Sequence, residues 1–375
     1  MKKKNIINIA KNIVDNSLKI KENENFLIEI YGLSGIKLGN EVIKYAQKIG
    51  AHVFYNIIDY NLLKNMIENA SEDYMKDYAN FDLCRMKKMD AYLAIKSVDK
   101  PNIMANIKSS NMKLYNNYYT LPVHLNERVN NTKWCLINYP TKYLANKSEL
   151  SFEEYCELYY KVCTLDYNKL SLAMDNLVSL MKKTNKVKII GPGTNIEFSI
   201  KGINCQKYYG TYNLPDGEVA TSPVKDSING YITYNTKSIY NGIELNNIKF
   251  KFKSGKIIEA TADKTDILND ILNTDEGSRF IGEFALGLNP YITRVMGDVL
   301  YDEKIYGSFH LTPGMSENEF DNGNRSAIHW DLVCIQTLNN GGGEIYFDDV
   351  LVRKDGEFVL EELKQLNKSN FWLEI

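Results

Sequence analysis

The sharpest chemical signal in the sequence is the run His329-Trp330-Asp331, in which an imidazole and a carboxylate stand two residues apart. On a β-strand, residues two apart project from the same face, so these side chains would point together into one pocket, as two ligands of one cation must. The chain has only four histidines, and a second one, His310, precedes His329 by nineteen residues in another strand-like segment. Taken alone, His-x-Asp fits scattered polar residues near a turn better than a metal site.

Two glutamates shift the balance toward a metal site. Glu218 lies in the segment LPDGEVATSP, whose Pro, Gly and Asp residues leave the carboxylate no role in a helix or a strand. Glu283 lies in the apolar run FIGEFALGLNP. A buried glutamate without a partner is costly, so a nearby cation is the simplest explanation.

Together these side chains form a mixed oxygen and nitrogen ligand set, which suits Zn, Co or Mn. Five ligands are more than one tetrahedral structural zinc needs, and a carboxylate that bridges two ions would use them all. This geometry is typical of two-metal hydrolases, in which metal-bound water loses its proton near neutral pH and attacks a polarised carbonyl. The residue types therefore predict a hydrolase with two divalent metal ions, held by Glu218, Glu283, His310, His329 and Asp331.

The first half of the chain must then supply a scaffold, and in it strand-like apolar runs alternate with helical segments. Residues 36–48 show helical periodicity that ends near Gly50, and Ser151 with Glu154 makes a capping box that opens a later helix. Strands that alternate with helices predict a parallel sheet covered by helices. The predicted strands are residues 26–31, 52–58, 91–96 and 133–138.

The second half has a different texture, because apolar residues recur at every second position after residue 187. Residues 187–202 predict a hairpin with a Gly-Pro-Gly turn, and one helix at about 263–274 interrupts the strands. We therefore expect an α/β N-terminal domain with a mainly parallel sheet at 1–185. A β-rich α+β C-terminal metal-binding domain is expected at 186–375.

Four segments of the second half carry a family resemblance. The segments are LPDGEVATSPV, IGEFALGLNP, GSFHLTPG and IHWDLV, and their order and spacing resemble the metal-binding segments of the thermophilic aminopeptidase (aminopeptidase T-like) metallopeptidase family. The resemblance implies a two-domain enzyme, usually dimeric, that holds two divalent ions and removes N-terminal amino acids from peptides. It also implies that the same five residues are the ligands, with Glu283 expected to act as both ligand and catalytic residue.

One position departs from the family pattern. Many members carry a tyrosine seven residues after the first metal-binding histidine, where it is thought to help stabilise the transition state. Here that position is Glu317, in the polar stretch MSENEFDNGN. Either another group makes that contact or this branch works without it. Arg294 and Tyr291 are candidates for substrate contact, and each is as easily structural.

Two other readings of the same residues stay open. His-x-Asp with a distant histidine is also the composition of a mononuclear non-haem iron oxygenase. In that pattern the distant histidine normally follows the pair, whereas His310 precedes it, and two glutamates would be left idle. The other reading is a catalytically weakened metal-binding homologue, for which Glu317 is the only hint.

Composition limits the class of protein and its expected location and partners. The chain of 375 residues has 44% hydrophobic and 25% charged residues and a net charge of −2, so it reads as a globular protein with no global attraction to nucleic acid. No stretch approaches the roughly 18 apolar residues that a membrane span requires. Six cysteines without C-x-x-C pairing are expected to stay reduced. We therefore expect a cytoplasmic protein that binds neither nucleic acid nor a membrane, and the family resemblance adds peptide substrates and a homodimer.

Overall fold

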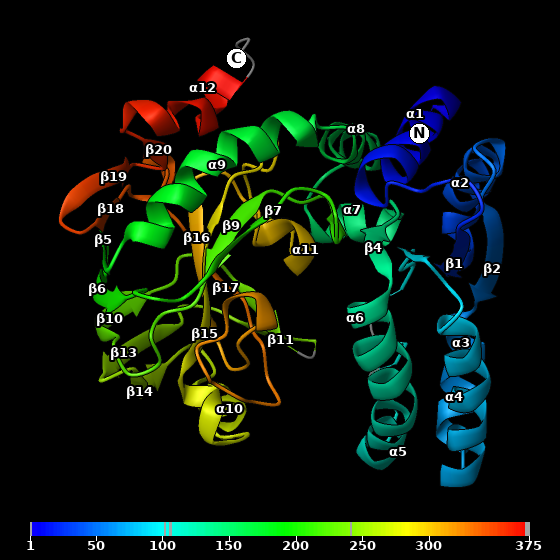
Figure 1. Ribbon diagram of the computed structural model, residues 1–375. Coiled ribbons are helices and arrows are strands. Elements are labelled where there is room, and N and C mark those ends of the chain that lie inside the picture. Colours follow the sequence, from blue (N-terminus) through cyan, green and yellow to red (C-terminus); the bar gives the residue numbers. More distant parts are fainter. Residues whose placement is uncertain (1, 101–102, 105–106, 241, 372–375) are drawn as a thin grey trace. The chain divides into compact units, whose positions relative to one another are not determined.

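The computed structural model describes residues 2–100, 103–104, 107–240 and 242–371, and it contains two compact units (Figure 1). Unit 1 comprises the chain up to Leu165 and the short later segment Gly210–Pro215. Unit 2 comprises Asp166–Tyr209 and the chain from Asp216 onward. The division therefore falls after Leu165, earlier than the expected boundary at residue 185. Helix α9 (Tyr167–Lys183), which we expected to close the first domain, belongs to unit 2.

Unit 1 is built on a parallel sheet, as the alternating pattern predicted. Its strand order is β2-β1-β3-β4-β8, and each neighbouring pair is parallel. The last strand comes from the segment that returns to this unit from further along the chain. The strands are β1 (Asn25–Tyr31), β2 (His52–Ile58), β3 (Ala91–Lys96), β4 (Lys133–Asn138) and β8 (Asn213–Leu214).

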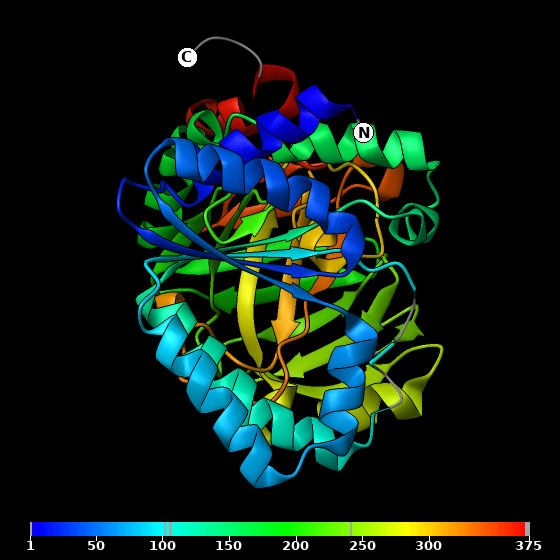
Figure 2. The same cartoon turned by 90° about the vertical axis from the view of Figure 1, so that its right-hand side faces the viewer.

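Helices cover the sheet of unit 1 on two sides, with α1, α2 and α8 on one side and α3, α4 and α5 on the other (Figure 2). The interior residues of β1 and β3 are buried, as expected for strands covered on both faces. The predicted capping box of Ser151 and Glu154 is present at the start of α8. The helices are α1 (Lys3–Asn12), α2 (Ile36–Lys48), α3 (Tyr60–Asn69), α4 (Glu72–Met86), α5 (Ser109–Tyr115), α6 (Val129–Asn131), α7 (Lys142–Lys147) and α8 (Phe152–Cys163), with π-helical turns η1 (Ile13–Ser17) and η3 (Asn116–Arg128) and a 3₁₀ turn η2 (Leu33–Gly35).

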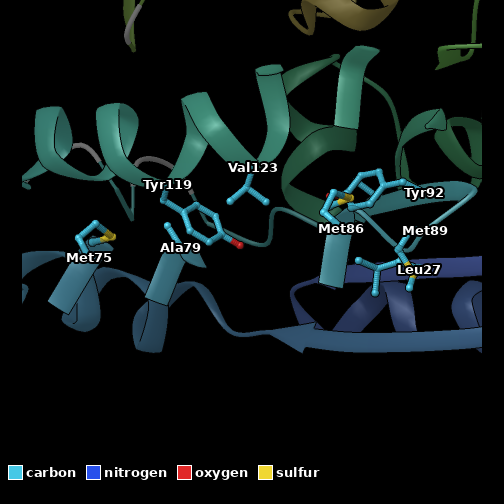
Figure 3. Close-up of a cluster of buried hydrophobic side chains, with 9 residues drawn as sticks. Leu27, Met75, Ala79, Met86, Met89, Tyr92, Tyr119 and Val123 are labelled. Carbon is cyan, nitrogen blue, oxygen red and sulfur yellow. The ribbon is translucent and has the colours of Figure 1, made fainter. Parts of the chain in front are cut away.

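A cluster of buried apolar side chains joins the sheet of unit 1 to the helices on one side. Figure 3 shows Met75 and Ala79 of α4 opposite Tyr119 and Val123 of η3. Burial of the leucine, valine and methionine side chains contributes roughly 1.5–3 kcal/mol each, so this cluster holds the helical layer on the sheet. Its members are Leu27, Met75, Ala79, Met86, Met89, Tyr92, Ala94, Tyr119 and Val123.

Unit 2 is β-rich and antiparallel, which confirms the predicted fold class. Its larger sheet has the order β14-β13-β10-β6-β5-β18-β19-β20. The predicted hairpin is formed by β5 and β6, and Gly193 adopts a φ of +65° in the two-residue turn between them. The strands of this sheet are β5 (Lys186–Gly191), β6 (Thr194–Ser199), β10 (Asn229–Thr233), β13 (Lys249–Lys253), β14 (Lys256–Thr261), β18 (Glu344–Phe347), β19 (Val350–Lys354) and β20 (Glu357–Phe358).

A smaller sheet of unit 2 carries most of the candidate ligands. Its order is β17-β16-β15-β9-β7, all pairs antiparallel, and every residue of β9, β15, β16 and β17 is buried. Carboxylates and imidazoles in such strands lie inside the unit, where they require partners. The strands are β7 (Cys205–Tyr208), β9 (Glu218–Thr221), β15 (Ile281–Gly287), β16 (Ser308–Pro313) and β17 (Leu332–Ile335).

The remaining elements of unit 2 are short. A two-stranded ribbon joins β11 to β12, and α10 lies within the helix predicted at 263–274. No helix among the described residues combines the length and the apolar character needed to cross a bilayer. The elements are β11 (Ser238–Tyr240), β12 (Ile243–Leu245), α10 (Thr265–Leu272), α11 (Val299–Asp302) and α12 (Lys368–Phe371), with 3₁₀ turns η4 (Glu276–Arg279), η5 (Asn318–Phe320), η6 (Leu338–Asn340) and η7 (Glu361–Leu366).

Candidate metal centre

The register of the smaller sheet brings residues far apart in the sequence onto one face. Glu283 pairs with Thr312, and Ala285 pairs with His310, so Glu283 and His310 occupy neighbouring rows. Glu218 pairs with Gly287 one row further along. Cross-strand partners share a face of a sheet, and so do residues two apart on one strand. Antiparallel pairing therefore places Glu218, Glu283 and His310 on the same buried face.

The His329-Trp330-Asp331 run lies just before β17, beside this face, and not within a strand as expected. Asp331 Oδ1 accepts a hydrogen bond of 2.7 Å from the Thr312 hydroxyl, and His329 Nε2 lies 3.4 Å from the same carboxylate oxygen. The predicted closeness of His329 and Asp331 is thus present in the structure. Thr312 was not singled out from the sequence, where a threonine in an apolar strand carries no signal of its own.

His329 is oriented by a backbone carbonyl. Its Nδ1 lies 2.9 Å from the carbonyl oxygen of Met315, and because a carbonyl only accepts, Nδ1 must donate there. Gly282 makes this approach possible, since a Cβ at that position would lie 2.3 Å from the same carbonyl oxygen. The other ring nitrogen, Nε2, is left facing carboxylates, which is how metal-binding histidines are commonly held.

Glu283 lies between the two histidines. Its Oε1 is 3.4 Å from His310 Nε2, and its Oε2 is 3.3 Å from His329 Nε2. The Nδ1 of His310 is buried and has no hydrogen-bond partner within the described part of the chain. Both imidazoles therefore direct Nε2 at the Glu283 carboxylate, each at a different oxygen.

Among the residues that the structure describes, two groups of ligand atoms share this glutamate. One comprises Glu283, His310 and Asp331, and the other comprises Glu283, His329 and Glu317; within each group the ligand atoms lie within 4.8 Å of one another. Ligand atoms about 2.0–2.2 Å from one ion can lie at most about 4.4 Å apart, so each group needs little movement to close on a cation. Oxygen and imidazole nitrogen ligands fit Zn, Co or Mn.

Charge and burial act against each other in this cluster. Burial alone would raise the pKa of the Glu283 carboxyl, but its contacts with His310 and His329 lower it to about 2. Burial likewise opposes a charge on His310, yet Glu283 and Glu218 raise the pKa of that imidazole to about 9. Without a metal, protons on the histidines balance the carboxylates, and a bound cation would take the place of these protons.

Glu218 has a different environment from the other candidates. Its Oε1 lies 2.6 Å from Nζ of Lys304, and its Oε2 lies 3.9 Å from His310 Nε2. Burial raises the pKa of Glu218 to about 7, although Lys304 and His310 act in the opposite direction. Glu218 is thus beside His310 without belonging to either group of ligand atoms, and its partner Lys304 was missed because nothing in DEKIYG marks a buried lysine.

The two candidates for substrate contact lie in the loop after β15. Tyr291 is half-buried and Arg294 is exposed, and their role remains a prediction.

Two solved structures share this fold over nearly the whole chain. Wild-type AmpT from Thermus thermophilus aligns with a TM-score of 0.78 at 19% identity, covering 96% of this chain and 100% of that one. A 2,5-dihydroxypyridine dioxygenase from Pseudomonas putida KT2440 aligns with a TM-score of 0.62 at 14% identity, covering 97% and 99%. At these identities the likeness establishes the fold. The class that the fold and the site define is a protein of two compact units, with imidazoles and carboxylates gathered on a buried sheet of the second unit.

The amino-acid sequence carries the assignment further. Aminopeptidase 2 of Geobacillus stearothermophilus is 24% identical over 87% of this chain and 88% of its own length. Aminopeptidase AmpS of Bacillus subtilis (strain 168) is 39% identical, but the match spans only 20% of this chain and 18% of that relative. The family model described as thermophilic metalloprotease (M29) matches residues 2–358, and the chain belongs to that family. The predicted metallo-aminopeptidase class, a hydrolase of peptide bonds, is thereby confirmed.

Proposed function

We propose that the chain is an aminopeptidase that removes N-terminal residues from peptides with water activated at a dinuclear divalent-metal site. The ligands we assign are Glu218, Glu283, His310, His329 and Asp331. The observation that carries the proposal is the position of Glu283, which faces His310 with one oxygen and His329 with the other. A carboxylate that faces two imidazoles in this way is suited to bridge two cations.

The charge balance around Glu283 supports two ions rather than one. Four carboxylates lie in or beside the ligand groups, and Lys304 is directed at Glu218 on one side of them. Several buried anions near one another are unfavourable unless cations offset them. Two divalent ions (Zn, Co or Mn) fit the mixed ligand set, whose carboxylates are Glu218, Glu283, Asp331 and Glu317.

The chemistry that such ions supply when bound is to lower the pKa of water and to draw electron density from the scissile carbonyl. The chain's own residues position that chemistry. The Thr312 hydroxyl fixes Asp331, and the Met315 carbonyl fixes His329. Glu283 lies at the centre, and in the dual role we expect for it one of its oxygens would have to be free of a cation to take a proton from water and pass it to the leaving amine.

An iron oxygenase is the alternative from another class, and a dioxygenase is among the proteins that share the fold. A mononuclear iron site of that kind uses two histidines and one carboxylate. Each ligand group here contains one histidine and two carboxylates instead. The donor set therefore favours the dinuclear hydrolase. A weakened metal-binding homologue would keep the ions without turnover, so an assay separates it from the enzyme.

We further propose a cytoplasmic location, peptide substrates and a homodimer, with no role in binding nucleic acid or membranes. The near-neutral net charge of −2 supports the absence of a nucleic-acid partner.

The experiment that tests the proposal measures metal content and hydrolysis of leucyl-p-nitroanilide. We expect about two divalent ions per wild-type chain and cleavage that chelation abolishes. Glu283→Gln should lower kcat by at least about 10²-fold, the order expected when a proton-transfer group is lost. The matched control is Glu259→Gln, which removes an exposed carboxylate on β14 that pairs with Lys251. The assignment would be contradicted if wild-type protein kept its activity after full chelation and Glu283→Gln were as active as wild type. One iron per chain would favour the oxygenase.

A further inference from the structure

We propose that Glu317 is itself a metal ligand, which binds one of the two ions together with His329 and Glu283, and that Tyr208 holds it in place. The inference rests on the dinuclear site proposed above and adds a residue to it. Its starting point is the second group of ligand atoms, in which oxygens of Glu283 and Glu317 and a ring nitrogen of His329 lie within 4.8 Å of one another.

The loop that carries Glu317 is anchored on both sides. Glu317 follows β16 and precedes the 3₁₀ turn η5. Its neighbour Ser316 is buried and lies 3.0 Å from the Ser222 hydroxyl, and Phe320 is buried at the other end of the turn. The Asn204 amide donates to the carbonyl of Glu319 within the turn. The backbone at Glu317 is therefore held against the smaller sheet before any ion arrives.

The side chain of Glu317 is held as well. Its Oε2 accepts a hydrogen bond of 2.6 Å from the hydroxyl of Tyr208, the last residue of β7. In the sheet, Tyr208 pairs directly with Glu218, so the tyrosine stands on a strand that already belongs to the site. Metal-binding carboxylates in proteins are commonly oriented in this way: one oxygen binds the ion, and a second residue hydrogen-bonds the other oxygen.

A purely structural role for the Tyr208–Glu317 pair accounts for less. It explains the hydrogen bond, but it does not explain why the Glu317 carboxylate lies beside the Glu283 carboxylate. Two like charges at this separation repel each other in a half-buried site. A divalent ion between them, also bound by His329, converts the repulsion into shared coordination. Glu319, two residues away, is exposed and belongs to neither group.

The test uses full-length protein stripped of metal and titrated with Zn²⁺ by calorimetry. Wild type should bind two ions per chain. In Glu317→Gln one ion should keep its affinity within about 3-fold, while the Kd of the other rises about 100-fold; Tyr208→Phe should raise the same Kd about 10-fold, in the range that second residues of metal sites produce. Glu319→Gln, which removes an equal charge from the same turn, should match wild type.

Three results would count against the inference, and the number of ions that the wild-type chain binds separates its failure from failure of the proposed function. Two unchanged Zn²⁺ affinities in Glu317→Gln would overturn the role of Glu317 and leave the dinuclear site intact. A wild-type chain that binds one ion would overturn the dinuclear site itself, and the inference with it. A crystal structure of Zn²⁺-loaded wild type needs no variant to fold: an oxygen of Glu317 about 2.0–2.2 Å from an ion supports the inference, and one further than about 3 Å from both ions overturns it.

Discussion

Nζ of Lys304 lies 2.6 Å from Oε1 of Glu218, and both side chains are buried. The lysine also contacts Glu303, and Asp216 lies 3.8 Å away, so one cation serves three carboxylates. Gly287 lets the lysine's segment pack closely, since a Cβ there would lie 2.3 Å from the carbonyl oxygen of Ile305. Lys304 therefore orients Glu218 at the edge of the candidate metal centre and partly offsets the effect of burial, which raises the pKa of that carboxyl.

Replacing Lys304 should destabilise the protein strongly. In metal-free protein, Lys304→Met leaves buried carboxylates without their cation, which typically costs about 3–5 kcal/mol of unfolding free energy. Urea unfolding followed by circular dichroism measures the change. Lys354→Met is the control, because its pair with Glu344 lies on the surface of β19 and surface pairs contribute little. Equal destabilisation by the two variants would mean that the buried ion pairs of Lys304 contribute no more to the free energy of unfolding than a surface pair does.

Gly282→Ala should damage the site through the backbone. A Cβ at Gly282 would lie 2.3 Å from the Met315 carbonyl oxygen and 2.4 Å from that of Gly314, so the loop must move. Because the Met315 carbonyl orients His329, we expect weaker Zn²⁺ binding together with about 1–3 kcal/mol of lost stability. In the control, Gly191→Ala, the new Cβ meets its nearest atom at an ordinary 3.5 Å. Unchanged Zn²⁺ affinity in Gly282→Ala would contradict the role of the carbonyl.

Thr312→Val should weaken metal binding without unfolding the protein. The substitution removes the hydroxyl that donates to Asp331 at 2.7 Å, and loss of such a partner typically lowers metal affinity by about 10–100-fold. Thr221→Val is the matched control on β9 of the same sheet, where the hydroxyl donates to the carbonyl of Asn204 instead. Zn²⁺ titration of both variants measures the difference. If they lose affinity equally, the effect belongs to the sheet and not to Asp331.

His124 should make unit 1 sensitive to acid. Burial, with a contribution from nearby Arg128, lowers the pKa of this imidazole to about 4, and its ring packs against Tyr92 and Tyr119. The unfolded chain binds a proton near pH 6.5 where the folded state does not. Unfolding therefore takes up a proton between about pH 6.5 and 4, and the free energy of unfolding falls as the pH falls through this window.

The measurement for His124 is the slope of unfolding free energy against pH in metal-free protein. His124→Gln should flatten the slope between about pH 6.5 and 4, whatever its effect on stability at neutral pH. His52→Gln, which changes an exposed histidine on β2, should keep the wild-type slope. A slope that is the same in all three proteins would show that His124 does not titrate in this window.

Local pattern in the sequence was sufficient for much of the fold. The apolar runs of β1 and β3 and the capping box of α8 were predicted because neighbours in the chain determine them. The same holds for the hairpin of β5 and β6, where the turn joins strands adjacent in sequence. The closeness of His329 and Asp331 was also readable from their spacing, although the structure places the pair just before β17 and not within a strand.

Only the tertiary structure decided which distant side chains meet. Strand β8 joins the sheet of unit 1 from residues 213–214, and no local signal announces a partner so far away in the chain. The register of β15 against β16 brings Glu283 to His310, and a register shifted by one residue would have turned them to opposite faces. Lys304 beside Glu218 and Glu317 beside Glu283 likewise depend on backbones that approach closely at Gly287 and Gly282. The sequence determines which residue types are available to the site, whereas long-range packing determines which of them meet there and which partners they have.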